Sequence, residues 1–433
     1  MPRTRLALAA AFVVAASFPS LAHAQKVWVV APTLGPGVDF NAILFAVNTA
    51  ASGDLVLVKS GTYGPFELDG KGMYVVEDAG ADVRIAGAPL LAVRNTSASQ
   101  PTWLHGLSNE GSSAPVPRLE ATDCAGSVLL SEVTWLKARE DFFGPPAFRA
   151  KACDDVVLDS CALIGLSGSV SCYGGSNCAC VTVDGANGIE LQSSKAAAFE
   201  CSLAGGAGVE QSWCCGSCSW QADLGGIGAV LDQSHLWLQG VAQGGNGGAG
   251  GVSPPAPICY GAAKCGSPGV RFADATSVLT QSGGSVSAGA AGQTLSQYCT
   301  PPTCNVADVD GPGTTIVQPR APKLALPPVA REGATVNATL SATPGIAALL
   351  VGTSIDALEL AGLSGWLLVS GTTALVPLGA VPPSGSLTLP IVVSELGAGI
   401  DFRVLYLQAG HCTAGGSCAL GVVRPIALLD AQF

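Results

Sequence analysis

Short apolar runs, each followed by a polar or glycine-containing turn, recur along the chain as far as residue 308. The clearest example is 226–251, in which two apolar runs, 229–231 and 235–238, are separated by a polar turn and followed by a run of glycines. Strands this short are poorly suited to a hairpin sheet of ordinary size, but they can stack coil upon coil in a parallel β-solenoid. The pattern therefore predicts a stacked repeat for most of the chain.

Five apolar triplets can be aligned as equivalent strands of successive coils, while the loops between them vary in length. A second strand, which precedes the triplet, is shared from the third coil onward. Each coil of such a stack contacts only its neighbours, so recurring strands with variable loops are the expected pattern. The aligned triplets are 128–130, 156–158, 189–191, 236–238 and 278–280, and the preceding strands are 181–183, 229–231 and 270–272.

The start of the repeat is expected to contain a helix. Asp39 is placed to cap a helix whose apolar residues recur at helical spacing over 40–51, and the strand 55–58 and the sequence Gly61-Thr62-Tyr63 follow at once. This pattern resembles the N-terminal entry of right-handed parallel β-helix proteins, the pectin-lyase-like group. The resemblance implies that the helix plugs the open end of the solenoid, which otherwise exposes unpaired strand edges.

The pattern changes after 309–328, a segment rich in proline and glycine that is predicted to be a linker. Seven strand candidates follow at a spacing of about 8–15 residues, with turns such as Ser370-Gly371 between them. This spacing, together with alternation typical of antiparallel strands, predicts a β-sandwich of about 100 residues. The predicted strands are 336–340, 347–351, 357–360, 366–369, 374–378, 387–389 and 402–409.

The fold class expected from these patterns is all-β: a right-handed parallel β-helix with an N-terminal capping helix, followed by a small antiparallel β-sandwich. The pairing of a glycine-rich β-helix with such a module resembles large exported proteins of environmental bacteria. The predicted boundaries are 1–24 for a signal peptide, 25–308 for the β-helix, 309–328 for the linker and 329–433 for the sandwich.

Residues 1–24 have the features of a secretory signal, because Arg3 and Arg5 precede an apolar run and Ala22-His23-Ala24 supplies the small residues of a cleavage site. We expect cleavage after Ala24, and secretion or display at the cell surface. The mature net charge is then −11 − 2 = −13. An acidic exported chain without a basic cluster or a second long apolar run is expected to bind no nucleic acid and to contain no membrane span.

Sixteen cysteines in an exported chain indicate disulfides. Three pairs close small loops that contain glycine or proline, and each crosslink is expected to stabilise the fold by about 2–3 kcal/mol because it restricts the unfolded chain. The predicted pairs are Cys259 with Cys265, Cys299 with Cys304, and Cys412 with Cys418.

The remaining ten cysteines cannot be paired from their spacing. Cys124 and Cys153 precede equivalent strands, so a bridge between adjacent coils is a further hypothesis. A second group consists of Cys172, Cys178 and Cys180 with Cys214, Cys215 and Cys218, and it includes a C-x-x-C spacing that suits zinc. An oxidising compartment favours disulfides among them instead.

Alternation along the stacked strands places Val156 and Leu158 inward, and Asp155 and Asp159 outward. Carried along the aligned coils, it gives one outer face with carboxylates, an imidazole and an indole on coils about 5 Å apart. Carboxylates suit proton transfer and a flat ring stacks on sugars, so the face is a candidate carbohydrate site, although a solvated sheet also needs polar residues that have no active role. The candidates are Asp155, Asp159, Glu190 and His235 for catalysis, and Trp237, Glu190 and Asp155 for ligand binding.

Enzymes of the pectin-lyase-like fold give a sharper comparison. Their hydrolases resemble one another in NTD, paired DD, GHG and RIK motifs, of which only Asp154-Asp155 matches here, and alternation points these two side chains in opposite directions. Their lyases use a Lys or Arg base beside acids that bind calcium, but Arg271 is several coils from Asp155. We therefore expect no cofactor and no metal, with calcium only if the chain is a lyase.

Three functions stay open. The first, favoured by the missing catalytic motifs, is an exported non-catalytic β-helix scaffold or adhesin-like surface protein whose partner is a cell-surface component or a polysaccharide. The second is a polysaccharide lyase or glycoside hydrolase that acts on an acidic polysaccharide through the face between Asp155 and Trp237. The third is a carbohydrate-binding protein in which Trp237 binds a glycan without turnover.

Overall fold

The structure is a computed structural model in which nearly all regular structure is β. The chain divides into two compact units, one containing Trp28–Arg320 and the other containing Ala321–Phe433, and we describe each by itself. The structure describes residues 25–433 except 88–89, 110–117, 137–144, 174–178, 210–212, 215–217, 220–221, 251, 254–257, 260–262, 295–301 and 372–373.

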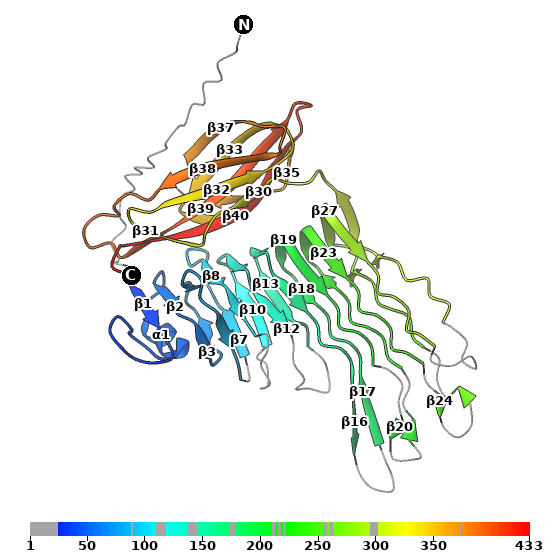
Figure 1. Ribbon diagram of the computed structural model, residues 1–433. Helices are drawn as coiled ribbons and strands as arrows, with labels where there is room; N and C mark the ends of the chain where they lie inside the picture. Colours follow the sequence, from blue (N-terminus) through cyan, green and yellow to red (C-terminus); the bar gives the residue numbers. More distant parts are fainter. Residues whose placement is uncertain are drawn as a thin grey trace. The chain divides into compact units, whose positions relative to one another are not determined.

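The first unit is a stack of short strands (Figure 1). Successive coils add strands to a 15-stranded sheet and to an eight-stranded sheet, and strands of neighbouring coils pair in parallel. Side chains that face the interior form one continuous apolar core from Val30 to Leu279. Each coil buries its apolar residues only against its neighbours, so the unit is a parallel β-helix, as the repeat pattern predicts.

The strands of the β-helix lie in three rows. In the larger sheet one row contains β1 (Val27–Val30), β2 (Leu55–Val58), β5 (Tyr74–Glu77), β8 (Thr102–His105), β11 (Val128–Ser131), β14 (Val156–Asp159), β19 (Lys195–Ala204), β23 (His235–Gln243), β27 (Val278–Ser287) and β29 (Thr314–Val317). The other row of that sheet contains β3 (Gly61–Tyr63), β6 (Val83–Ile85), β9 (Leu107–Ser108), β12 (Thr134–Leu136) and β15 (Ala162–Ile164). The eight-stranded sheet contains β4 (Glu67–Asp69), β7 (Leu90–Arg94), β10 (Arg118–Cys124), β13 (Phe148–Cys153), β18 (Ile189–Gln192), β22 (Ala229–Asp232), β26 (Val270–Phe272) and β28 (Val309–Asp310).

The predicted alignment of coils is right for three triplets and wrong for two. Strands β11 and β14 pair in the expected register, but the next strand of this row is β19, whose residues 196–198 lie opposite 156–158. The triplet 189–191 belongs instead to β18 in the other sheet. The reason is that 196–198 is a run of three alanines, which carries a weaker apolar signal than the triplet in β18.

The predicted alignment contains two smaller errors of register. In the last aligned coil Trp237 lies opposite Thr280, so the triplet 278–280 was placed one residue too early. Residues 181–183 are not equivalent to β22, because they lie in an antiparallel pair, β16 (Ser169–Tyr173) with β17 (Ala179–Val183). In addition, β28 and β29 pair with the preceding coil, so the segment predicted as a linker contains strands of the β-helix.

Single residues in left-handed conformation turn the chain between the rows of strands. Such a residue changes the chain direction without a loop, at a cost of about 1–2 kcal/mol when it is not glycine. Hydrogen bonds between equivalent corners of successive coils accompany these turns, as between Glu132 N and Asp159 O at 2.8 Å. The first row of corners is Gly106, Glu132, Ser160 and Glu200, and the second is Asn95, Asp123, Ala152, Ser193 and Gln233.

A column of hydroxyl and thiol side chains runs beside the second row of corners. Ser194 Oγ accepts a hydrogen bond from Cys153 N at 3.1 Å and donates to Gln192 O at 2.8 Å, and Ser234 repeats both contacts one coil later. Cys124 and Cys153 lie opposite each other in this column, and each thiol donates to the carbonyl two residues earlier at 3.4 Å. Both thiols are free, which corrects the hypothesis of a bridge between them.

The capping helix α1 (Ile43–Thr49) is shorter than predicted, and Asp39 does not cap it. The Asp39 carboxylate accepts a hydrogen bond from Val29 N at 2.8 Å instead, because the chain around residue 40 still runs beside β1. Lys71 Nζ donates to three carbonyls at the C-terminal end of the helix at 3.0–3.3 Å, where a cation is favourable. Ile43 and Val47 are buried in the core of the first coils, so the helix does close the stack.

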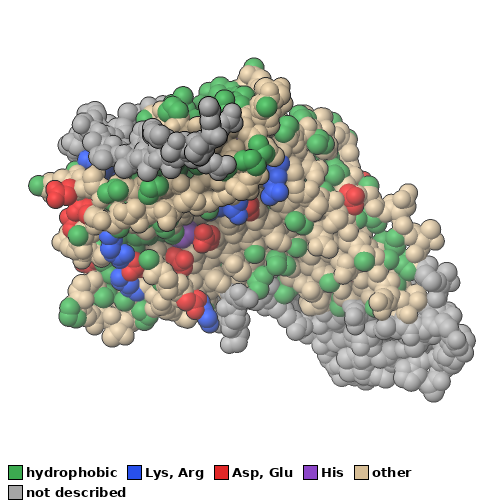
Figure 2. All heavy atoms as spheres, turned by 45° about the horizontal axis from the view of Figure 1, so that its top comes forward, with side chains coloured by type: hydrophobic (Ala, Val, Ile, Leu, Met, Phe, Trp, Pro, Cys, Tyr) green, Lys and Arg blue, Asp and Glu red, His purple; other side chains and the backbone are tan. Residues whose placement is uncertain are grey.

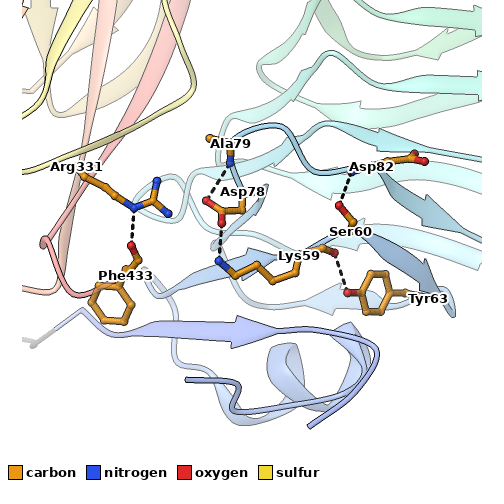
Figure 3. Close-up of polar contacts among 8 residues, drawn as sticks. All are labelled: Lys59, Ser60, Tyr63, Asp78, Ala79, Asp82, Arg331 and Phe433. Carbon is orange, nitrogen blue, oxygen red and sulfur yellow. Dashed lines mark hydrogen bonds and ion pairs between the residues drawn. The ribbon is translucent and has the colours of Figure 1, made fainter. Parts of the chain in front are cut away.

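Polar contacts join the first two coils beside the first row of corners (Figure 3). Lys59 Nζ forms an ion pair with Asp78, and Ser60 Oγ accepts a hydrogen bond from Asp82 N at 3.1 Å. The Tyr63 hydroxyl donates to Lys59 O at 2.8 Å. Burial raises the pKa of Tyr63 to about 12, so the phenol keeps the proton that it donates.

Glycine-rich segments of successive coils run side by side away from the stacked strands (Figure 1). Their backbones are linked at every third residue: Gly165 and Gly168 donate to the carbonyls of Ala204 and Ala207, and the same spacing recurs in later coils. Three residues per turn is the repeat of a polyproline II helix, which makes no hydrogen bonds within itself. We call these segments the glycine array; they are 165–168, 184–188, 204–209, 222–228, 243–250, 263–269 and 287–294.

Glycine is required in the glycine array because no room exists for a side chain. A Cβ added at Gly206 would lie 1.8 Å from Leu166 O, and one added at Gly245 would lie 1.9 Å from Gly206 O. Collagen uses glycine for the same reason. The glycine run that begins at residue 244 is therefore a packed backbone layer, not the flexible turn that its composition suggests.

Three short antiparallel hairpins lie at the far ends of the glycine array (Figure 1). Each interrupts one of three successive coils between an outgoing and a returning segment. The hairpins are β16 with β17, β20 (Trp213–Cys214) with β21 (Cys218–Ser219), and β24 (Val252–Ser253) with β25 (Ile258–Cys259).

The second unit is built from mainly antiparallel sheets around its own core, which includes Leu340, Leu349, Leu407 and Ile426. All seven predicted strands overlap observed ones, and the longest strand not predicted, β40, is buried along most of its length and so lacks alternation. The three-stranded sheet contains β30 (Lys323–Ala325), β32 (Thr335–Ser341) and β38 (Ser386–Val392). The six-stranded sheet contains β31 (Val329–Arg331), β33 (Gly345–Gly352), β35 (Leu363–Ser364), β37 (Ala374–Val381), β39 (Phe402–Thr413) and β40 (Cys418–Leu429), and β34 (Ser354–Glu359) pairs with β36 (Trp366–Ser370).

Candidate functional site

The residues predicted to form a catalytic face do not converge. Asp155 and His235 are separated by the intervening strand β19, about 10 Å across two coils. Asp159 lies four residues along the chain from Asp155, about 13 Å away in an extended strand. Both carboxylic acids are buried, with exposed fractions of 7% and 0%. His235 Nε2 lies 2.9 Å from the hydroxyl of Thr280 on the next coil.

Trp237 is buried, which corrects the prediction that its ring is displayed for stacking on a sugar. Its exposed fraction is 0%, and its ring meets the edge of Phe199 with centroids 4.6 Å apart. Leu129 and Val157, on the same outer side of the sheet, are buried as well. The outer side of these strands is therefore a packed apolar layer rather than a solvated face.

Glu190 lies in the other sheet and belongs to a structural contact. The Arg149 guanidinium donates to Glu190 Oε2 at 2.8 Å, and Asn187 Nδ2 donates to Oε1 at 2.8 Å. Arg149 and Glu190 are register partners on adjacent coils, in strands β13 and β18. The pair therefore joins two coils, and it lies apart from Asp155 and Trp237.

A different set of side chains converges at the first row of corners, and we call it the corner cluster: Glu77, His105 and Glu132. Glu77 ends β5, His105 ends β8, and Glu132 is the left-handed corner after β11. One ligand atom of each lies within 4.8 Å of those of the other two. Burial, together with the charges of Glu132 and Asp82, raises the pKa of Glu77 to about 7.

Sequence reasoning missed the corner cluster, although a signal for it exists. The three residues stand 105 − 77 = 28 and 132 − 105 = 27 positions apart, close to the length of one coil in this part of the stack. Residues that recur at the coil length lie above one another in a solenoid. The predicted alignment begins at residue 128, so it contains neither Glu77 nor His105.

The disulfides partly follow the predictions. Cys412 bonds to Cys418 across the turn between β39 and β40, as the loop spacing predicts. Cys265 bonds to Cys304 rather than to Cys259, which also removes the pairing of Cys299 with Cys304. The observed bond spans 39 residues and so joins two coils. Pairing cysteines that are close in the sequence gave the wrong partners, because in a solenoid the nearest residue in space is often one coil away in the chain. Residue 299 lies outside the described residues.

Two pairs of thiols line the core beside the corners. Cys161 and Cys201 follow the first row of corners, as Cys124 and Cys153 follow the second, and all four are buried and free. Burial and the neighbouring Cys161 thiol raise the pKa of Cys201 well above its ordinary value. The Cys201 thiol therefore stays protonated in the core.

No protein-family model matches the chain, and a search of curated proteins finds no sequence similar to it. Among the described residues, no helix has both the length and the apolar character needed to cross a membrane.

Proposed function

We propose that the chain is an exported β-helix protein, right-handed and similar in architecture to the pectin-lyase-like group, that binds a cell-surface polysaccharide without cleaving it. The observation that carries this proposal is the set of three hairpins at the far ends of the glycine array (Figure 1). Binding residues are often presented on loops that a rigid scaffold holds in place. Here three successive coils supply adjacent loops on one scaffold.

Rigid presentation of the hairpins is supported by their surroundings. The glycine array is hydrogen-bonded in more than one direction, since Gly206 N donates to Ala186 O while Gly205 N donates to Gln243 O. The disulfide between Cys265 and Cys304 lies on the returning side of the later coils. Loops whose conformation is fixed before binding lose less entropy when a ligand arrives.

The composition of the hairpins supports a neutral glycan as partner. The hairpin segments 169–183, 213–219 and 252–259 contain no charged residue, and they include Tyr173 and Trp213 beside serine, threonine and asparagine. Aromatic rings and short hydroxyl or amide side chains are the groups that combine apolar contact with adaptable hydrogen bonding. In Figure 2 the charged side chains of the visible face lie mostly in the left half of the view, and charged residues make up only 12% of the chain.

The non-catalytic part of the proposal is supported by the dispersal of the predicted acids. Glycosidases hold two carboxyl groups about 5–10 Å apart across the scissile bond. Asp155 and Asp159 are buried at opposite ends of one strand, and Glu190 is paired with Arg149. A lyase or hydrolase is kept as the alternative outcome of the test.

The test is a microarray of neutral and acidic polysaccharides probed with the full mature chain. We expect binding to neutral glycans that is lost when 169–183 is replaced by a short Gly-Ser turn. Replacing 137–144, which belongs to the chain segment that joins β12 to β13, is the control and should leave binding unchanged. Binding to no glycan, or equal binding by the hairpin variant, would overturn the proposal. New reducing ends or unsaturated products from the same glycans would support the enzyme instead.

A further inference from the structure

The corner cluster joins three successive coils through side chains that are typical metal ligands. His105 is almost fully buried, with 2% of its side chain exposed, while Glu77 is 20% exposed and Glu132 is exposed to solvent. An ion can therefore enter from the solvent side, and the imidazole forms the floor of the site. A mixed set of one nitrogen and two carboxylate oxygens suits a first-row divalent ion such as Zn²⁺.

Polar contacts at Nδ1 fix the orientation of the His105 ring. The indole N–H of Trp103 donates to Ser131 Oγ at 2.7 Å, and the same oxygen lies 2.9 Å from His105 Nδ1. The ring is thereby fixed with Nε2 toward the carboxylates. Ligating histidines are usually held in this way through their other ring nitrogen.

The spacing of the ligand atoms fits an ion better than a direct contact. His105 Nε2 and Glu77 Oε1 are 3.7 Å apart, which is too long for a hydrogen bond. Two tetrahedral ligands at the usual zinc distances are about 3.4 Å apart, so His105 and Glu77 are within a few tenths of an ångström of that spacing. All three ligand atoms lie within 4.8 Å of one another.

The chain also leaves space for the carboxylates at this corner. A Cβ at Gly106 would lie 2.0 Å from Glu77 Cδ, so the corner residue next to His105 must be glycine for Glu77 to occupy its position. Two carboxylates and an imidazole thus meet at this corner.

We propose that Glu77, His105 and Glu132 bind one first-row divalent cation, for which Zn²⁺ is the probe, and that water completes its coordination. The ion would crosslink three coils near the start of the β-helix. Calcium is not expected to replace it, because calcium prefers six to eight oxygen ligands and the site offers an imidazole. This site is independent of the hairpins and of the proposed glycan binding.

The experiment is equilibrium dialysis of the untagged, chelator-treated full chain against Zn²⁺ and, separately, Ca²⁺, with thermal melting as a second readout. We expect one zinc ion to bind and to raise the melting temperature. Glu132→Gln and Glu77→Gln should each weaken zinc binding at least tenfold and remove the thermal shift. Glu200→Gln, at the same kind of corner two coils later, is the matched control and should change neither.

A variant that keeps all three ligands but removes the hydroxyl beside His105 Nδ1 separates coordination from a general effect on the fold. Ser131→Ala should weaken zinc binding about tenfold through loss of His105 orientation. A cobalt-loaded sample should show visible absorption that Glu132→Gln abolishes. The proposal is overturned if wild type binds no zinc, if Glu132→Gln binds zinc as tightly as wild type, or if calcium binds as tightly as zinc. Zinc held by thiols elsewhere would persist in both glutamine variants.

Discussion

Replacing Gly245 by alanine probes the glycine array directly. The new Cβ would lie 1.9 Å from Gly206 O, whereas real Cβ contacts stay beyond 3.0 Å, so the two segments must separate by at least 3.0 − 1.9 = 1.1 Å. That separation strains two hydrogen bonds of the same residue, from Gly245 N to Gly226 O at 2.7 Å and from Ser267 N to Gly245 O at 3.0 Å.

The expected loss of stability follows from these contacts. Overpacking a dense interior costs about 1–3 kcal/mol, and each lost backbone hydrogen bond costs about 1 kcal/mol. The free energy of local opening should therefore fall by about 3–5 kcal/mol. Gly64→Ala is the control, because nothing lies within 4 Å of its Cβ position. That variant should be neutral, or more stable by about 0.4–1 kcal/mol through reduced freedom of the unfolded chain.

Amide hydrogen exchange followed by mass spectrometry measures this locally. In Gly245→Ala, peptides covering 204–209, 222–228 and 243–250 should exchange at least about 100-fold faster, since each 1.4 kcal/mol of opening free energy is a factor of ten in rate. Peptides from the second unit should exchange as in wild type. If the array peptides of Gly245→Ala exchange at the wild-type rate, close packing of the glycine backbones is refuted.

Two further predictions concern single side chains. Cys153→Ser should change the free energy of unfolding by less than about 1 kcal/mol, because a serine can donate to the carbonyl two residues earlier as Ser194 does, whereas loss of a disulfide costs about 2–4 kcal/mol. Alkylation in denaturant without reductant, followed by peptide mapping, should label Cys153 in wild type. Glu77 has a folded-state pKa of about 7 against an ordinary 4.5, so the stability that its protonated form contributes is complete below pH 4.5 and is lost as the pH rises through 7. In the metal-free protein Glu77→Gln should therefore be more stable than wild type at pH 8, by about 1–2 kcal/mol after solvent screening, and equal to it at pH 4. Chemical denaturation at the two pH values measures this, and an equal difference at both would contradict the assignment.

Much of the secondary structure could be predicted from local patterns. Strand β2 and the seven strands of the second unit follow from apolar runs and alternation, because inward-facing residues of a strand must be apolar whatever their partners are. The helix was located correctly by its apolar face. Its start was not, because Asp39 serves β1 rather than the helix, and that choice depends on a neighbouring strand.

The candidate site shows what local sequence patterns cannot predict. Alternation correctly places Asp155 and Trp237 on the outer side of their strands, but it cannot tell whether that side meets water, and both residues are buried. Nor can it tell which sheet a triplet joins, so Glu190 was placed beside residues from another sheet. The corner cluster depends on the register of three coils, which the lengths of the loops set.

By itself the sequence determined that this chain forms short stacked strands, that they begin with an apolar helix, and that an antiparallel unit follows, because these features depend on each segment's own pattern of apolar residues. Only the tertiary structure decided that glycine-rich stretches pack as a backbone layer, that Cys265 bonds to Cys304, and that Glu77, His105 and Glu132 meet. Those outcomes are contacts between coils, and their partners stand about one coil apart in the chain. The sequence of one segment does not determine which residues of the next coil lie beside it.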